Sequence, residues 1–220
     1  MPATTRKELV SEVIYRQLRK DIITGKLRPG SRLVELDVAK RFNASQVPVR
    51  EAFLRLEEQG LLRMVKHTGT FVSEIFIDEM KELSEHRILI EKNAISQAMY
   101  VMKPEDKAQL ARIYDDMIRH AARNDLDLLI EADMNFHETL IALSGKKILL
   151  QMWKLLDAQL QRFILLVHPK YFGNLTEIAE AHRDILDAVI TNDIRAAQQA
   201  CEDHIRLIWQ KIDALQNSPV

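Results

Sequence analysis

Features that would point to a secreted or membrane protein are missing from this chain. It has one cysteine, Cys201, so an intrachain disulfide framework is excluded, and this fits a reducing cytoplasm. No apolar run approaches the roughly 20 residues that a membrane-spanning helix needs. The first residues also lack the apolar core of a secretory signal. We therefore expect a soluble, cytoplasmic protein.

The net charge of the chain is close to zero, but the charged residues are unevenly distributed. The 220 residues have a formal net charge of −1. Residues 1–74 hold 14 Lys or Arg against 9 Asp or Glu, whereas residues 75–220 hold 17 against 23. A mildly basic segment followed by an acidic one indicates a polyanionic partner for the first segment only. The length permits two domains, which we place at residues 1–74 and 75–220.

The first segment has the pattern of a winged helix-turn-helix. Helical periodicity runs over residues 7–24 and 35–42 and over a third stretch that begins at Ser45. Two short β-prone runs, residues 61–65 and 70–74, flank a glycine-containing loop and predict a hairpin. Two short helices followed by such a hairpin are typical of a winged helix-turn-helix.

The third stretch, residues 45–61, has the pattern of a DNA-reading helix. Ser45 is placed to cap its first turn, and Gly60 supplies a stop. One face is apolar, and the exposed face begins with Gln46 and Arg50, four residues apart and therefore neighbours. Amide and guanidinium groups near a helix N-terminus suit base edges in a major groove. The apolar face consists of Val49, Ala52, Phe53 and Leu56.

The second segment is predicted to be an all-α bundle. Helical periodicity extends over residues 78–101, 104–123, 125–143, 147–167, 174–190 and 193–215. No glycine-rich loop or β-prone alternation interrupts it. Six helices of this length form a six-helix bundle, so the whole chain is expected to be mostly α.

Four polar residues lie on apolar stripes of this predicted bundle: Asp133, His137, His182 and His204. Unpaired buried polar groups cost on the order of 2–7 kcal/mol each. One divalent transition metal ion with nitrogen and oxygen ligands would satisfy all four together. The alternative is that each histidine is hydrogen-bonded separately within the core.

The first segment resembles the GntR superfamily of bacterial transcription regulators. The similarity implies a homodimer on a palindromic double-stranded DNA operator, with Arg50 contacting DNA and the wing around Gly69 in the minor groove. The matching residues are Leu27, Pro29, Gly30 and Leu33, then Pro48-Val49-Arg50-Glu51-Ala52, Leu56, Gly60-Leu61, and Gly69-Thr70 with Val72.

Two positions depart from the GntR pattern. Gln46 and Leu36 stand where such regulators commonly have arginine. Because glutamine prefers adenine and arginine prefers guanine, we expect an operator that differs at the base facing Gln46. Ser45 and Val47, which flank Gln46, are further candidate DNA contacts. Arg32, Arg55, Lys66 and His67 are also candidates, and for these four ordinary solvation is an equal alternative.

The second segment resembles the FCD ligand-binding domain of FadR-type regulators. The resemblance rests on Asp133-x-x-Phe136-His137, on His182 and His204, and on Arg87-x-x-x-Glu91. It implies a Zn, Ni, Mn or Fe ion per subunit and a small organic acid as effector. Arg87 and Arg162 are candidates for the effector carboxylate, although Arg87 could instead pair with Glu91. A purely structural ion is the other alternative.

Three function classes explain these two segments to different degrees. A ligand-responsive transcription factor, usually a repressor, explains both segments. A metalloenzyme is disfavoured because no general base or nucleophile accompanies the Asp/His cluster. An architectural DNA protein leaves the acidic second segment unexplained. No role is assigned to His86, His120 or His168, and Cys201 is interpreted as a small core residue.

Overall fold

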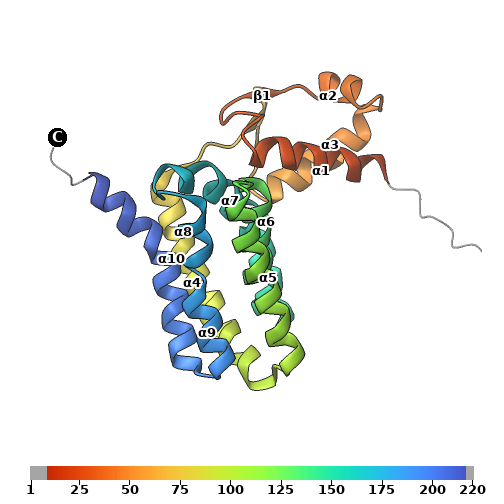
Figure 1. Ribbon diagram of the computed structural model, residues 1–220. Coiled ribbons are helices and arrows are strands. Elements are labelled where there is room, and N and C mark those ends of the chain that lie inside the picture. Colours follow the sequence, from red (N-terminus) through yellow and green to blue (C-terminus); the bar gives the residue numbers. More distant parts are fainter. Residues whose placement is uncertain (1–8, 217–220) are drawn as a thin grey trace, which may run out of the picture. The chain divides into compact units, whose positions relative to one another are not determined.

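A computed structural model describes residues 9–216 of the chain (Figure 1). The chain divides into two compact units, and the boundary falls between Ile75 and Phe76. The first unit contains three helices and a small sheet, and the second is helical throughout its described part. Within residues 9–216, no helix combines the length and apolarity needed to cross a bilayer. The mostly α fold class predicted from the sequence is confirmed.

The helices of the first unit pack around the third one. They are α1 (Val10–Ile23), α2 (Glu35–Arg41) and α3 (Gln46–Glu58). Helix α3 packs against both α1 and α2, and it buries the four apolar residues predicted for its inner face. The predicted start of the first helix at Lys7 lies outside the described residues.

The ends of α3 differ in how well they were predicted. Gly60 adopts a φ of 68° just after the helix, a left-handed conformation that glycine reaches without strain and that ends helices. At the other end, Ser45 occupies the N-cap position, but its side chain makes no capping hydrogen bond. The predicted side-chain cap is therefore wrong, and the exposed hydroxyl stays on the surface at the start of α3.

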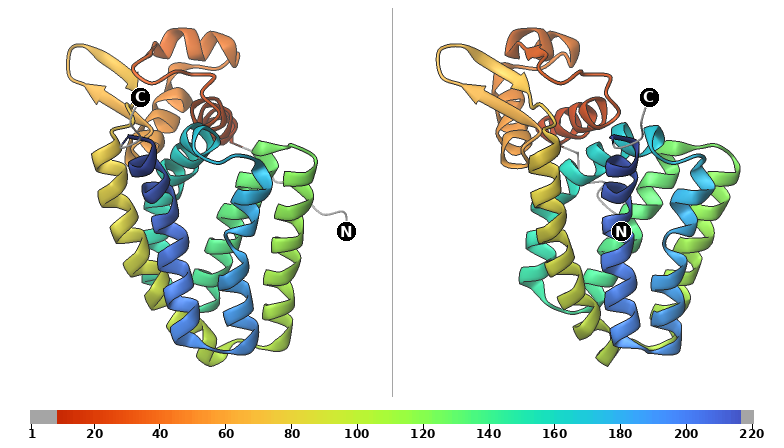
Figure 2. Two further views of the ribbon diagram at one scale, coloured as in Figure 1. Left: turned by 60° about the vertical axis from the view of Figure 1, so that its left-hand side comes forward. Right: turned by 90° about the vertical axis from the view of Figure 1, so that its left-hand side faces the viewer.

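The wing is a three-stranded antiparallel sheet. Strands β2 (Leu62–Val65) and β3 (Gly69–Val72) form the predicted hairpin, with Leu62 opposite Val72 (Figure 2). Strand β1 (Arg32–Leu33) pairs with the other edge of β3. The sequence did not predict β1, because two residues are too short to show an alternating pattern.

The second unit is the predicted bundle. Its α-helices agree with the predicted ranges to within a residue at most ends, and left-handed asparagines mark two of the predicted breaks, at Asn124 and Asn192. The elements are α4 (Ile77–Val101), α5 (Pro104–Ala122), α6 (Leu126–Leu143), α7 (Lys147–Val167), the 3-10 turn η1 (His168–Lys170), α8 (Leu175–Glu180), α9 (Arg183–Thr191) and α10 (Ile194–Gln216).

Helix α6 occupies the interior of the bundle. It packs against α4, α5, α7 and α8, while α10 packs against α4 and α9. Figure 2 shows these helices running roughly along one common direction. The residues on the inner face of α6 are consequently surrounded by neighbouring helices, and Phe136 and His137 are fully buried.

One predicted helix is divided. The sequence favoured a single helix over residues 174–190, but Ala181 and His182 form a turn between α8 and α9. The turn allows α8 to pack against α5 and α6 while α9 packs against α5 and α10. His182 thus lies at the N-cap position of α9, and its side chain is fully buried.

Candidate functional site

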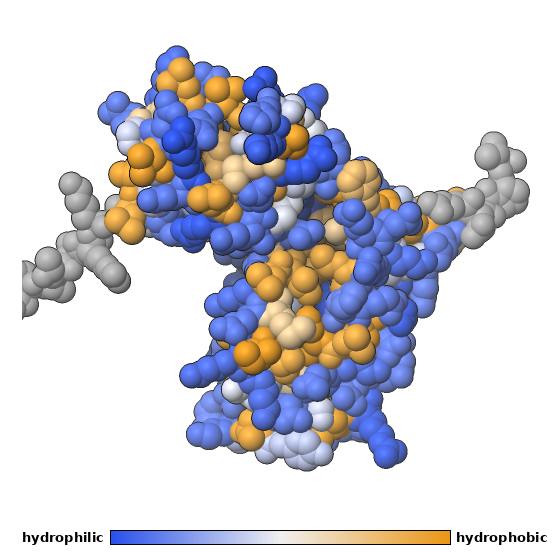
Figure 3. Space-filling model, turned by 180° about the vertical axis from the view of Figure 1, so that it is seen from behind, coloured by the Kyte–Doolittle hydropathy of each residue, from blue (hydrophilic) through white to orange (hydrophobic). Residues whose placement is uncertain are grey.

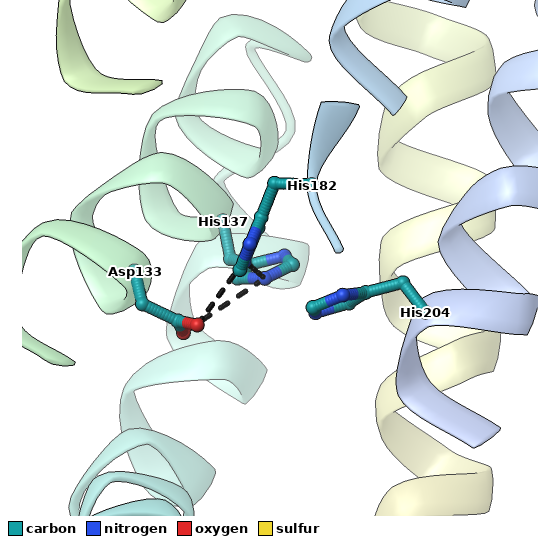
Figure 4. Close-up of side chains that lie close together, drawn as sticks. All are labelled: Asp133, His137, His182 and His204. Carbon is teal, nitrogen blue, oxygen red and sulfur yellow. Dashed lines mark hydrogen bonds and ion pairs between the residues drawn. The ribbon is translucent and has the colours of Figure 1, made fainter. Parts of the chain in front are cut away.

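The four predicted metal ligands converge in the helical unit. Asp133 and His137 lie one turn apart on α6, His182 precedes α9, and His204 lies on α10. Each offers one ligand atom, and these four atoms lie within 4.8 Å of one another. Figure 4 shows the side chains directed toward a common point. The inward orientation predicted from helical spacing thus places all four in one cluster.

Hydrogen bonds determine which nitrogen carries the proton in two of the imidazoles. His182 Nδ1 lies 3.2 Å from the carbonyl oxygen of Ile178. His137 Nδ1 lies 2.7 Å from a carboxylate oxygen of Glu91. Carbonyl and carboxylate oxygens accept hydrogen bonds, so each Nδ1 donates. In the neutral form of each ring, Nε2 therefore presents a lone pair to the cluster.

These lone pairs require a positive charge between them. The Nε2 atoms of His137 and His182 are 3.2 Å apart, and His182 Nε2 is 3.1 Å from Asp133 Oδ2. Zinc and similar ions lie about 2 Å from nitrogen and oxygen ligands, so two ligands of one ion are roughly 3 Å apart. The observed spacing fits a shared divalent ion, and the mixed nitrogen and oxygen donors suit Zn, Ni, Mn or Fe.

Other atoms of the cluster also lack partners. Asp133 Oδ1 and His204 Nδ1 are buried and have no hydrogen-bond partner in the described structure. Burial lowers the pKa of His204 well below its usual value, and burial likewise lowers the pKa of His137. Protonation of these rings therefore does not supply the missing positive charge. The donor set fits a bound cation.

Glu91 on α4 connects the cluster to Arg87. Its carboxylate accepts hydrogen bonds from Arg87 Nε at 2.5 Å and from His137 Nδ1 at 2.7 Å, and it also accepts one from Cys201 Sγ at 3.3 Å. Burial alone would raise the pKa of Glu91, but Arg87 and His137 outweigh it and lower that pKa. Glu91 is therefore an ionised acceptor that orients His137, as the outer partners of metal-ligating histidines commonly do.

Replacing Glu91 by glutamine is expected to weaken metal binding about 10- to 100-fold, because His137 loses the carboxylate that fixes its orientation. Zinc affinity measured by competition with a chromophoric chelator checks this. Glu85→Gln is the matched control, since Glu85 lies on the same helix and pairs with Arg206 at the surface. Equal zinc affinities for the two variants would contradict the role given to Glu91.

Cys201 takes part in this network but not as a ligand. Its thiol donates to Glu91, and burial raises the pKa of Cys201 well above its usual value. A protonated thiol is neither a nucleophile nor a good metal ligand. The structure therefore supports its interpretation as a core residue.

A small cavity lies against the cluster. Asp133 and His204 contribute to its wall, together with Arg87, Ser84 and His168, and apolar side chains of α7 and α10 complete it. Arg87 Nη2 is buried and has no hydrogen-bond partner. The cavity therefore combines one side of the cation site with an available guanidinium group. That pairing suits a carboxylate ligand.

The two arginines considered for the carboxylate differ in position. Arg87 pairs with Glu91 through Nε, as the alternative interpretation expected, and its Nη2 is still available to a ligand. Arg162 on α7 is also buried, with 3% of its surface exposed, but the residues that line the cavity do not include it. Geometry therefore favours Arg87 over Arg162.

The N-terminal end of α3 presents exposed side chains. Ser45, Gln46, Val47 and Arg50 are all exposed, and Val47 is 63% exposed. Arg50 Nε donates to Glu35 on α2 at 2.7 Å, and its Nη2 lies 3.4 Å from the Gln46 amide oxygen. This exposed ion pair contributes little stability, so Arg50 can exchange it for another anion.

The wing contains three predicted DNA contacts, Lys66, His67 and Gly69. Lys66 and His67 form the β2–β3 turn, where His67 adopts a φ of 61°. A Cβ at Gly69 would lie 2.9 Å from Arg32 Nε, so the absent side chain leaves room for that guanidinium group. Arg32 and the wing turn therefore belong to one basic edge.

Arg55 is placed differently from the other candidates. Its Nη1 donates to Glu12 at 2.5 Å, and its guanidinium group lies 3.8 Å from the centre of the Tyr15 ring. Both partners belong to α1, so in the DNA-free protein Arg55 faces α1.

Two family models match this chain, one in each of its two units. The FCD domain model matches residues 82–207, and the model of bacterial regulatory proteins of the gntR family matches residues 10–72. The HTH-type transcriptional repressor RspR of Escherichia coli (strain K12) is 29% identical over 206 residues, which covers 92% of this chain and 89% of that protein. A probable D-xylose utilization operon transcriptional repressor of Paenarthrobacter nicotinovorans is 27% identical, covering 91% and 89%.

Solved structures share the fold. Escherichia coli McbR/YncC superposes with a TM-score of 0.79 at 21% identity, covering 96% of this chain and all of that chain. A GntR regulator from Rhodococcus sp. RHA1 gives a TM-score of 0.77 at 22% identity, covering 95% and 99%. The family models and the relatives agree on a regulator and not an enzyme. The chain belongs to the GntR family of bacterial regulatory proteins and is a DNA-binding transcription regulator with a C-terminal FCD domain.

Proposed function

We propose that this regulator is a repressor whose helical unit binds one divalent transition metal ion and a small organic acid. Acid binding changes the affinity of the DNA-binding unit for its operator. The observation that carries the proposal is the approach of the His137 and His182 Nε2 atoms to 3.2 Å beside Asp133. Asp133 and His204 in turn line a cavity that Arg87 also lines.

Asp133, His137, His182 and His204 are the residues that hold the ion. Once bound, Zn, Ni, Mn or Fe supplies a Lewis acid that attracts an anionic oxygen. Glu91 orients His137, and the Ile178 carbonyl orients His182. The protein thus keeps two imidazoles fixed with Nε2 directed at the ion before it binds.

The acid binds in the cavity next to the cluster. Its carboxylate accepts a hydrogen bond from Arg87 Nη2, the buried donor that lacks a protein partner. Arg87 can keep its Nε bond to Glu91 at the same time, so effector binding does not break the network that supports His137. Arg162 is the second candidate for the carboxylate and is disfavoured because it lies off the cavity wall.

DNA binding is assigned to residues 1–74, and sensing and dimerisation to residues 75–220. Arg50 and Gln46 read base edges in the major groove, with Ser45 and Val47 beside them. Arg32, Lys66, His67 and Gly69 contact the backbone or the minor groove through the wing. Arg55 pairs with Glu12 of α1 in the DNA-free protein and is the remaining candidate for a phosphate contact.

A homodimer is proposed from an apolar surface on the helical unit. Helices α4 and α7 pack together and lie on the side of the bundle that Figure 3 faces, where that figure shows a patch of hydrophobic residues. Ile148, Met152 and Leu155 repeat along one face of α7 with 44–66% exposure, and Leu89 on α4 is 69% exposed. Monomeric surfaces rarely keep such clusters, and a second copy would cover it with the same patch.

Leu155→Glu is therefore expected to convert the dimer to a monomer, because the charge would be buried without a partner in the interface. Light scattering coupled to size-exclusion chromatography measures the mass. Ile190→Glu on α9 is the control. Ile190 is an exposed hydrophobic residue too, at 49% exposure, but it lies outside the α4–α7 patch. A dimeric Leu155→Glu protein, or a monomeric wild type, would contradict the proposed interface.

A gel-retardation assay tests the proposal as a whole. The DNA is the promoter region beside the gene, and the protein is used with zinc and after chelation, each with a panel of small carboxylic acids. Specific retardation that an acid weakens only in the metal-loaded protein is the expected result. Specific retardation that no acid changes would refute the effector proposal, and catalytic turnover without DNA binding would favour a metalloenzyme instead.

A further inference from the structure

Exposed apolar side chains accompany the polar residues at the start of α3. Leu36 lies in the first turn of α2 and is 48% exposed, and Val47 lies in the first turn of α3 and is exposed to a greater extent. Apolar surface is stabilised when it is removed from water. Both residues therefore favour a partner that covers them with an apolar group.

Both residues lie next to one cluster of polar side chains. Arg50 Nε donates to Glu35 at 2.7 Å, and Arg50 Nη2 lies 3.4 Å from Gln46 Oε1. This cluster joins the N-terminal parts of α2 and α3. Leu36 directly follows Glu35 in α2. Val47 precedes Arg50 by three residues in α3, a spacing that makes two side chains neighbours on the surface of a helix. A partner that contacts this cluster would therefore also contact apolar groups.

The major groove of DNA presents a methyl group at only one of the four bases. Thymine carries its C5-methyl group there, whereas the other bases are distinguished by hydrogen-bond donors and acceptors. Leucine and valine side chains make no hydrogen bonds, so the methyl group is the feature of a base edge that they can distinguish. Gln46 fits the same base pairs, because glutamine prefers adenine and adenine pairs with thymine.

Resting on the proposed DNA-reading face of α3, we infer that Leu36 and Val47 select thymine in the operator through its methyl group. Each residue covers the methyl group of one thymine in each half-site, beside the bases that Arg50 and Gln46 contact. The preference comes from removing apolar surface from water, so it persists at high salt, where phosphate contacts weaken. Leu36 and Val47 thus determine sequence specificity without a hydrogen bond or a charge.

Replacing thymine by deoxyuridine tests this inference, since uracil pairs with adenine as thymine does but lacks the methyl group. The probe is a duplex that the full wild-type chain selects from random DNA, and its thymines are replaced one position at a time. Fluorescence anisotropy should show an affinity loss of about fourfold at each contacted thymine, the effect of one apolar group that is no longer buried. Leu36→Ala and Val47→Ala should each become insensitive to the replacement of the thymine that the substituted residue contacts.

Leu54→Ala is the matched control. Leu54 is also an exposed leucine of the DNA-binding unit, at 52% exposure, but it lies on α3 about two turns beyond Val47. This variant should keep the wild-type sensitivity to deoxyuridine at every position. Repeating the titrations at a higher salt concentration should leave the fourfold ratio unchanged, and a ratio that vanished there would refute methyl recognition.

The outcomes separate this inference from the proposed reading face beneath it. If Arg50→Ala binds the selected duplex as tightly as the wild type, the reading face itself is refuted. If Arg50→Ala weakens binding but deoxyuridine has no effect at any position, the reading face stands and methyl recognition is refuted. A variant that keeps every deoxyuridine-sensitive position of the wild type refutes the role of the residue that it changes. An effect of the methyl group on DNA shape alone would give such persistent sensitivity.

Discussion

Replacing Asp133 by asparagine is expected to abolish most of the stabilisation that zinc confers, while leaving the metal-free protein at least as stable as the wild type. A ligand at 1,000 times its dissociation constant stabilises a protein by about 4 kcal/mol. Asparagine keeps the size of the side chain but removes the anionic ligand, so that stabilisation is lost. Thermal unfolding with zinc and after dialysis against a chelator measures both effects.

In the metal-free protein, Asp133→Asn is expected not to lower the stability, because the carboxylate that it removes is buried. Asp133 is 2% exposed and its Oδ1 has no hydrogen-bond partner. Its Oδ2 lies 3.1 Å from His182 Nε2, which presents a lone pair when Nδ1 carries the proton, so two acceptors face each other while no metal ion lies between them. A neutral amide of the same shape avoids that cost.

The exposed Glu131 on the same helix supplies the control. Glu131→Gln should respond to zinc as the wild type does. If metal-free Asp133→Asn protein were several degrees less stable than metal-free wild type, Asp133 would be a structural residue and its unpaired carboxylate would not mark a cation site.

Replacing Arg50 by alanine is expected to weaken operator binding about 10- to 100-fold, the range for losing one good bidentate base contact of roughly 1–3 kcal/mol. Non-specific DNA should be bound with nearly unchanged affinity. Fluorescence anisotropy with operator and scrambled duplexes, at two salt concentrations, measures both. An equal loss on the two duplexes would identify Arg50 as a phosphate contact.

Two neighbouring substitutions sharpen that experiment. Glu35→Gln removes the carboxylate that holds Arg50 at 2.7 Å in the DNA-free protein, so operator affinity should stay equal or rise slightly. Gln46→Arg should shift the preferred base from adenine toward guanine at one position. Selection from random DNA that returns the same base for wild type and Gln46→Arg would refute base reading by Gln46.

Helical spacing was enough to place the four ligand residues. Asp133 and His137 occupy core positions of an apolar stripe, and an amphipathic helix must turn that stripe inward. The same reasoning applied to His204 on α10. For His182 the expected continuous helix was wrong, yet the residue is buried, since the turn at Ala181 keeps its side chain inside the bundle.

Contacts between distant helices could not be predicted in the same way. Glu91 and His137 are 46 residues apart and Glu91 and Cys201 are 110 apart. Spacing within a helix says which face is buried but not which residue of another helix it meets. His168 was missed for a related reason, because it lies in a 3-10 turn between helices where no periodic pattern exists.

Because Cys201 donates a hydrogen bond to Glu91, the reactivity of its thiol reports local opening of the helical unit. This thiol is the one cysteine of the chain, it is completely inaccessible, and its partner carboxylate also supports His137. A disulfide exchange reagent can reach it only when the bundle opens locally. The rate of thiol labelling therefore measures the frequency of that opening. Slower labelling on addition of an ion or acid would reveal tightening of the helical unit without any engineered probe.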